Sequence, residues 1–152
     1  FQCDFWCWPM FKRAAEREGI EDAPGTLGIL CDPKHPALAQ FPTEFHSNWQ
    51  WWRLVKNSRP LILDGTPHDY RPIVQVIDNF ARNHKLGLLF EARVGGGSLL
   101  VCAIDLPDLQ DKPEGRQFLA SLLAYVHGPT FTPAKELSAD SVAAILGSAG
   151  GS

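Results

Sequence analysis

The chain has 152 residues, of which 45% are hydrophobic and 20% are charged, values typical of one globular domain that buries its own core. The formal net charge is −3 and the pI is near 5.9, so no basic stripe is available to neutralise phosphates. Nucleic acid is therefore not an expected partner. No run of about 18 apolar residues is present either, so no membrane-spanning helix is predicted.

The domain organisation is simple. A single α/β module is predicted over residues 1–146, and the Gly/Ser-rich residues 147–152 have the composition of a flexible linker. The chain begins at Phe1 without an initiator Met or a basic-then-apolar signal region. That beginning indicates a processed chain, a fragment or an excised segment.

The four cysteines are predicted to be free thiols. They are Cys3, Cys7, Cys31 and Cys102, and none forms the tight Cys-x2-Cys pair that is usual in structural zinc sites. Cys31 and Cys102 lie in apolar runs typical of strands, where reduced Cys packs as a small hydrophobe. The sequence predicts neither a metal nor a cofactor.

The first third of the chain predicts two helices and one strand. Residues 4–18 form the first helix, ended by Gly19, and residues 26–31 form a short apolar strand. The two prolines of residues 32–36 predict an irregular loop. The pattern Ser47-x-x-Gln50 is that of a capping box and predicts a second helix over residues 48–57.

Residues 60–146 complete a mixed α/β domain without internal repeats. Four further strands are predicted over residues 60–64, 73–77, 86–94 and 98–104, and two helices over residues 115–127 and 134–146. The glycines at 95–97 predict a tight hairpin. The connection over residues 78–85 is short, so the strands on either side of it are expected to be antiparallel neighbours.

The aromatic stretch at residues 41–52 is the first candidate site. It contains three of the five tryptophans. An indole exposed beside polar groups can stack on a sugar ring. The alternative is that these residues form an aromatic cluster in the core with polar residues that cap the helix. Trp52 is predicted to lie in the core and another indole to face solvent. The candidate carbohydrate ligands in this stretch are Glu44, His46, Asn48, Trp49 and Trp51.

A second set of candidate ligands lies at predicted strand ends, where α/β sheets bind small molecules. These residues are Asp32, His35, Asp78, Asn83 and His84. The alternative is that they only make loop hydrogen bonds. No Glu-x-x-His or His-x-His spacing favours a metal. A catalytic alternative would use Glu44 with His46, or Asp78 with His84, for acid–base work.

Several long motifs resemble one known family. They are Phe5-Trp-Cys-Trp-Pro-Met-Phe11, Gly25-Thr-Leu-Gly-Ile-Leu-Cys-Asp-Pro-Lys-His-Pro-Ala-Leu38, residues 41–52, residues 72–80 and residues 82–91. Together they are similar to the C-terminal part of large bacterial proteins of glycoside hydrolase family two, which are β-galactosidase-like and carry sugar-binding domains. The resemblance covers residues 1–127.

The resemblance implies a class I glutamine-amidotransferase-like module with a flavodoxin-like, three-layer arrangement of helices around a mixed sheet. The hairpin at residues 92–105 and the helix after it fit the closing elements of that module. Its earlier strands have no counterpart before residue 4, so the fold is either truncated or completed by another chain. Cys31 and Cys102 both lack the Gly-x-Cys-x-Gly nucleophile elbow, which implies a module without amidotransferase chemistry.

The resemblance therefore implies a non-catalytic accessory module of a β-galactosidase-like glycoside hydrolase, serving carbohydrate contact, oligomerisation or both. Expected partners are carbohydrate and either the rest of a larger hydrolase or another copy of the chain. The expected location is the periplasm or the extracellular space. One alternative is a small stand-alone carbohydrate-active hydrolase, and another is a purely structural domain. An exposed sheet edge is expected to pair with another chain or copy.

Overall fold

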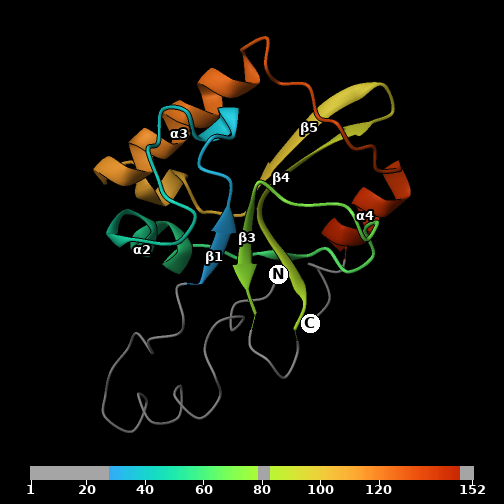
Figure 1. The fold of residues 1–152 in the computed structure, drawn as a ribbon, viewed down its shortest axis with the longest axis horizontal. Coiled ribbons are helices and arrows are strands. Elements are labelled where there is room, and N and C mark those ends of the chain that lie inside the picture. Colours follow the sequence, from blue (N-terminus) through green and yellow to red (C-terminus); the bar gives the residue numbers. More distant parts are fainter. Residues whose placement is uncertain (1–27, 79–82, 148–152) are drawn as a thin grey trace, which may run out of the picture.

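The structure is a computed structural model, and it describes residues 28–78 and 83–147 (Figure 1). The predicted helix over residues 4–18, Cys3 and Cys7 lie outside the described residues. So do Asn79 to Arg82 and most of the predicted linker.

A five-stranded, open antiparallel sheet forms the centre of the domain, with the order β1-β3-β4-β2 and with β5 also paired to β4. Its strands are β1 (Ile29–Cys31), β2 (Leu61–Ile62), β3 (Val74–Ile77), β4 (Lys85–Val94) and β5 (Gly97–Cys102). All five match predicted strands, and β3 and β4 are antiparallel neighbours as expected. A flavodoxin-like sheet is mostly parallel. The ladders between these five strands are all antiparallel.

An irregularity in the pairing of β3 with β4 reverses the alternation of side chains along β4. Val74 pairs with Leu89 and Gln75 with Gly87, so the pairing skips Leu88. Side chains alternate between faces along a regular strand, and one extra residue reverses that alternation. Leu88 and Leu89 accordingly both join the same core cluster, while Phe90 joins the other.

The β4–β5 hairpin closes through two glycines, as predicted. Gly95 has φ 56° and Gly96 has φ 86°, values that side-chain-bearing residues rarely adopt. Two consecutive positive φ angles give the turn type that matches the twist of paired strands. The turn therefore fixes the register of the hairpin.

Helices cover both faces of the sheet (Figure 1). Helices α2 (Trp49–Lys56) and α3 (Pro113–Val126), with the short 3-10 helix η1 (Pro36–Leu38), pack on one face around Phe118 and Leu89. Helix α4 (Ala139–Gly147) contributes to the opposite core cluster, and a second 3-10 helix, η2 (Pro107–Leu109), precedes α3. The predicted mixed α/β class is confirmed, although α4 begins later than residue 134.

Two details of the predicted α2 are wrong. The N-cap is Asn48 instead of Ser47, and the Gln50 amide donates to the carbonyl of Pro42 at 2.6 Å instead of closing a capping box. The core indole is Trp51, with no exposed surface, whereas Trp52 is only partly buried. Trp51 lies two positions after Trp49, the first residue of α2, so its side chain points to nearly the opposite side of the helix. That side faces α3, where Trp51 contacts Phe118.

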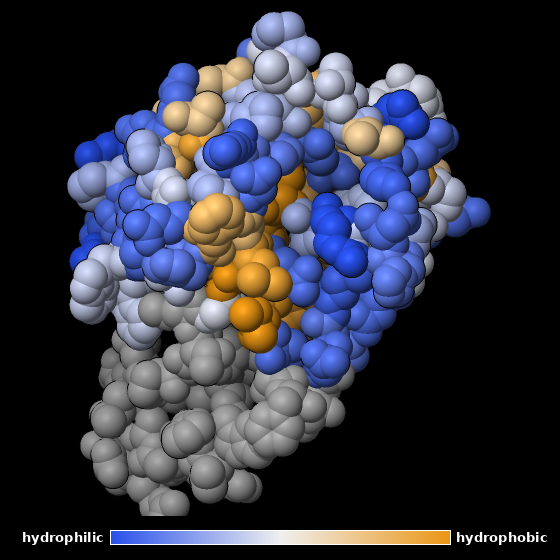
Figure 2. All heavy atoms as spheres, viewed as in Figure 1, coloured by the Kyte–Doolittle hydropathy of each residue, from blue (hydrophilic) through white to orange (hydrophobic). Residues whose placement is uncertain are grey.

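An apolar patch lies over β1 and β3 on the face shown in Figure 2. It includes Leu30 and Ile77, which are 54% and 44% exposed. Among residues 28–78 and 83–147, no helix is long and apolar enough to cross a membrane.

Candidate functional site

An open groove of about 520 Å³ lies where the N-terminal ends of α2 and α3 meet. Trp49 and Gln50 contribute from α2, and Glu114 and Gln117 contribute from α3. Phe41, Pro42 and Pro113 complete the lining. The groove therefore combines apolar ring surface with amide and carboxylate groups, a composition typical of ligand sites.

Trp49 is the most exposed large hydrophobic side chain among the described residues, at 86%. Its ring meets Trp52 edge to face, with centroids 6.4 Å apart and planes at 68°. Trp52 is partly buried, so it supports the Trp49 ring from one side. The rest of the Trp49 indole is open to solvent and to the groove.

The polar side chains of the groove are held by their own contacts. Glu114 Oε1 lies 3.4 Å from Arg53 Nε, and this ion pair joins α3 to α2. The Gln117 amide donates to the carbonyl of Gln40, and the Gln50 amide donates to that of Pro42. These contacts leave each residue with further polar capacity, since a carboxylate or an amide can make more than one hydrogen bond.

Trp51 does not belong to this surface, although the sequence placed it among the candidate ligands. Its indole is completely buried, and its Nε1 donates to Thr43 Oγ1 at 2.7 Å. Its ring packs edge to face on Phe41 and Phe118, with centroids 5.2 and 5.7 Å away. Trp51 is thus a core residue and offers no face to a ligand.

Glu44, His46 and Asn48 lie on the loop that leads into α2. His46 Nε2 is 3.0 Å from Glu44 Oε2, and both side chains are about two-thirds exposed. Asn48 is the exposed N-cap of α2 and makes no side-chain cap hydrogen bond. These residues precede Trp49 in the chain but are absent from the groove lining.

The strand-end residues Asp32 and His35 make local contacts. Asp32 Oδ1 accepts from the Lys34 amide at 2.9 Å, and His35 Nδ1 accepts from the Ala37 amide at 3.2 Å. Both bonds stabilise the loop that enters η1. Here the alternative interpretation, loop hydrogen bonding, accounts for the geometry.

His35 also belongs to a half-buried polar cluster with Glu91 and Tyr125. Its Nε2 lies 3.9 Å from Glu91 Oε1, and the Tyr125 hydroxyl donates to Glu91 Oε2 at 2.6 Å. Burial lowers the pKa of His35 below its ordinary value, and the nearby carboxylates of Glu91 and Asp32 only partly oppose that effect. His35 is therefore held mainly as a neutral ring.

The second predicted pair was Asp78 with His84, but the His84 imidazole pairs with Asp64 instead. Asp78 Oδ2 accepts from the His84 backbone amide at 3.1 Å, while the His84 imidazole Nδ1 lies 2.6 Å from Asp64 Oδ2. Burial alone would raise the pKa of Asp64, but hydrogen bonds from His84 and from the Lys85 amide outweigh it and lower that pKa. Asn83 has φ 53° and lies two residues before the start of β4.

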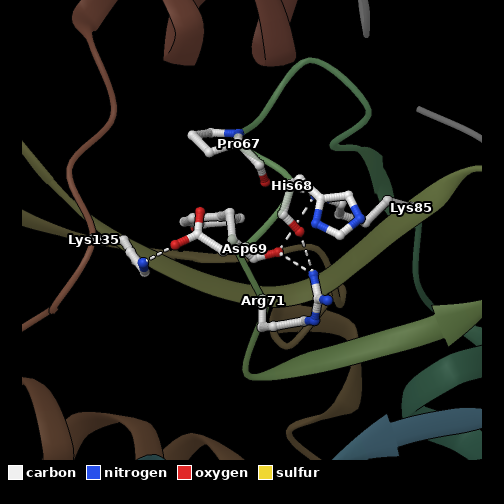
Figure 3. Close-up of polar contacts among 7 residues, drawn as sticks. Pro67, His68, Asp69, Arg71, Lys85 and Lys135 are labelled. Atoms are coloured by element: carbon white, nitrogen blue, oxygen red, sulfur yellow. Dashed lines mark hydrogen bonds and ion pairs between the residues drawn. The ribbon is translucent and has the colours of Figure 1, made fainter.

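Lysines secure the loop after Asp64 (Figure 3). The Lys85 ammonium donates to Thr66 Oγ1 at 3.0 Å and to the Pro67 carbonyl at 3.1 Å, and Lys135 pairs with Asp69. Arg71 reaches back to the His68 carbonyl at 2.7 Å. The loop is thus held by contacts within the protein, and Lys85, Lys135 and Arg71 are all engaged in these contacts.

The thiols and acidic groups give no metal or nucleophile site within the described parts of the chain. Cys31 and Cys102 are free, and burial raises the pKa of each, that of Cys102 to about 11. Both therefore remain protonated near neutral pH. No group of three or more His, Cys, Asp or Glu side chains converges there.

The fold and the groove define a mixed α/β domain with an aromatic, partly polar surface site. The sequence matches the family described as "Domain of unknown function (DUF8487)" over residues 1–147, and the chain belongs to this family. No curated protein matches the sequence. The family description names no activity.

Sequence reasoning identified Trp49 but missed its neighbours from α3. Glu114 and Gln117 stand three apart on the helix, a spacing that places both on one face. That spacing could have been read from the sequence. Their meeting with Trp49 depends on the tertiary packing of α3 against α2, for which no local signal exists.

Proposed function

We propose that this domain is a non-catalytic module that contacts carbohydrate through the groove beside Trp49. The observation that carries the proposal is an indole that is 86% exposed at a groove shared with Gln50, Glu114 and Gln117. Covering this indole with a ligand would be favourable, because burying a large side chain is worth about 1.5–3 kcal/mol.

The chemistry of the groove suits a sugar better than a purely apolar ligand. The C–H faces of a pyranose can stack on the indole, while its hydroxyls can donate to the Glu114 carboxylate and exchange hydrogen bonds with the two glutamine amides. The groove is open, so it would hold one or two rings of a longer glycan without enclosing them. Contact of this kind is expected to be weak for one site and useful for an attached enzyme.

The proposed context is that of an accessory module of a β-galactosidase-like glycoside hydrolase. The motif resemblance and the exposed aromatic groove support it. The closer fold assignment, a class I glutamine-amidotransferase-like module, is also a proposal. Helices on both faces of the sheet and the glycine turn into β5 support it. It requires that another chain or the rest of a larger hydrolase adds parallel strands to this antiparallel set, and an assembly without such strands would overturn it.

A small stand-alone carbohydrate-active hydrolase is the second candidate. The pairing of the His84 ring with Asp64 at 2.6 Å favours it, because a carboxylate that orients an imidazole is a common acid–base arrangement. The exposed Glu44–His46 pair is the other such arrangement. Hydrolysis of aryl glycosides by wild-type protein, lost on His84→Ala or His46→Ala, would support this candidate.

The test of the main proposal is a glycan array followed by titration calorimetry of the best ligands. Trp49→Ala should weaken binding at least about tenfold, since loss of a stacking contact worth about 1.4 kcal/mol has that effect. Glu114→Gln should weaken it less. Leu123→Ala, which truncates an exposed apolar side chain elsewhere on α3, is the matched control and should leave affinity unchanged.

Two outcomes would contradict carbohydrate contact at this groove. If no glycan binds, or if Trp49→Ala and Leu123→Ala bind equally well, the groove does not contact carbohydrate. The structural alternative would then be the better interpretation of the domain.

A further inference from the structure

Strand β5 presents an outward-facing set of backbone groups along one edge of the sheet. The Ala103 amide donates to the Leu88 carbonyl at 2.8 Å. From this pair, every second residue of β5 is hydrogen-bonded to β4, as far as the pair of Gly97 with Val94 next to the turn. The residues between these pairs must point their N–H and C=O groups away from β4. Those residues are Ser98, Leu100 and Cys102.

None of these three residues has a backbone partner on its outer side within residues 28–78 and 83–147. Side chains do not protect the edge either. The strand Gly97-Ser-Leu-Leu-Val-Cys102 contains no charge and no proline, and Leu99 to Cys102 are all only partly buried. Natural proteins usually protect such edges with charges, prolines or bulges. An unprotected edge of this kind is a surface for strand pairing.

We propose that two copies of this chain pair through β5, antiparallel to each other, about a two-fold axis at Leu100. A two-fold interface brings the same patch of both subunits together, and an antiparallel strand pair has this symmetry. In this register Leu100 lies opposite the partner's Leu100, and Ser98 lies opposite the partner's Cys102. All three outward-facing residues then exchange hydrogen bonds with the second copy.

The side chains are compatible with this register. Leu100 and Cys102 pack toward the α2/α3 core cluster, and Val101 packs toward the α4 cluster. Pairing would therefore extend both apolar layers across the axis, with Leu99 opposite the partner's Val101. No charged residue lies between Gly95 and Ile104, so no like charges meet.

The ends of the interface also fit. The register brings the glycine turn of one copy toward residues 104–105 of the other. A pocket of about 590 Å³ lies there, lined by Cys102, Ile104, Asp105 and Arg59 among others. A turn made of glycines has no side chains to exclude it, and its carbonyls can accept from the Arg59 guanidinium. This complementarity between turn and pocket favours a second copy over an unrelated strand.

Strand β1, at the other edge of the sheet, fits self-pairing less well. It has three residues against the six of β5, so it offers fewer backbone groups. The β4–β5 hairpin is longer and extends to the upper right of the molecule in Figure 1. The inference rests on the β5 edge alone and is independent of carbohydrate contact.

Sedimentation analysis over a concentration series measures whether the chain is a dimer. Two variants that place a positive or a negative charge at residue 100, on the two-fold axis, test the proposed interface. The wild-type chain should be a dimer, and Leu100→Lys and Leu100→Glu should each be monomeric because two like charges would face each other. An equimolar mixture of the two variants should restore dimers. Leu123→Lys, the same change on α3, should stay dimeric, and circular dichroism should show that each variant is folded.

A disulfide trap tests the register. Antiparallel hydrogen-bonded partners have Cα atoms about 5.5 Å apart, within the range that a disulfide spans. Ser98→Cys should therefore form a covalent dimer on mild oxidation, and Ser98→Cys with Cys102→Ala should not. A monomeric wild-type chain, a dimer unaffected by Leu100→Lys, or cross-linking that does not need Cys102 would each overturn the proposal.

Discussion

Tyr125 and Glu91 join helix α3 to the longest strand of the sheet. The Tyr125 hydroxyl donates to Glu91 Oε2 at 2.6 Å, while the Tyr70 hydroxyl donates to the Glu91 backbone carbonyl, also at 2.6 Å. Burial raises the pKa of both tyrosines, so each hydroxyl keeps its proton over the physiological range. Glu91 is thereby held by hydrogen bonds from two separate parts of the chain.

Removing the Tyr125 hydroxyl should destabilise the domain measurably. A hydrogen bond to a charged group contributes about 1.5–3 kcal/mol, and Glu91 is only 16% exposed at its side chain. We expect Tyr125→Phe to lower the free energy of unfolding in urea by about 1.5 kcal/mol. Tyr125→Phe in a Glu91→Gln background should cost much less. Equal costs in both backgrounds would show that the pair is not coupled.

The pH dependence of stability should carry a contribution from His35. Burial lowers its folded-state pKa below the ordinary value of 6.5, so the unfolded chain binds the proton more tightly. Stability from this residue is present above pH 6.5 and is lost as the pH falls toward the folded-state pKa.

Urea unfolding of wild type and His35→Asn between pH 8 and pH 5 checks this expectation. Asn can still accept from the Ala37 amide but does not titrate, so the variant should lose less stability on acidification. Parallel pH profiles for the two proteins would contradict the assignment, because the titrating group would then lie elsewhere.

The two indoles of α2 should respond very differently to truncation. Trp51 is fully buried, and Phe/Trp→Ala changes in cores cost about 3–5 kcal/mol. Trp49 is 86% exposed, and changes at such sites usually stay within about 0.5 kcal/mol. Thermal unfolding of Trp51→Ala and Trp49→Ala should therefore separate them clearly. Similar losses for both would mean that Trp49 packs more extensively than its exposure indicates.

The strands could be predicted from the sequence because their signals are local. The glycine turn at residues 95–96 and the apolar runs beside it determine the β4–β5 hairpin without reference to the rest of the chain. The irregularity at Leu88 could not be predicted in the same way. It depends on how β3 pairs, and a continuous apolar run from Leu86 to Phe90 fits either alternation.

The candidate site was predicted only in part, for a related reason. The indole cluster in the sequence indicated a surface role for part of α2, and Trp49 has the exposure that this role requires. Which indole enters the core depends on Phe41, Thr43 and Phe118, which meet Trp51 only in the folded chain. The groove likewise needs α3, which lies far along the sequence. Helical periodicity alone therefore assigned the wrong tryptophan, Trp52, to the core.

Gly115 allows η2 to pack closely against α3, and replacing it should destabilise the domain. A Cβ at this position would overlap the carbonyl oxygen and side chain of Leu109, and the obstacle is partly backbone. Overpacking of this kind costs about 1–3 kcal/mol, more than Ala gains over Gly in helix propensity. We expect Gly115→Ala to lower the free energy of unfolding by about that amount.

Gly65 provides the matched control, with the opposite expected sign. No atom lies within 4 Å of a Cβ at Gly65, so Ala fits there without a clash. Ala also restricts the unfolded chain, which stabilises by about 0.4–1 kcal/mol where the backbone is compatible. Urea unfolding of both variants should therefore give changes of opposite sign. If Gly115→Ala matched or exceeded wild-type stability, the contact between η2 and α3 would have to be looser than the structure places it.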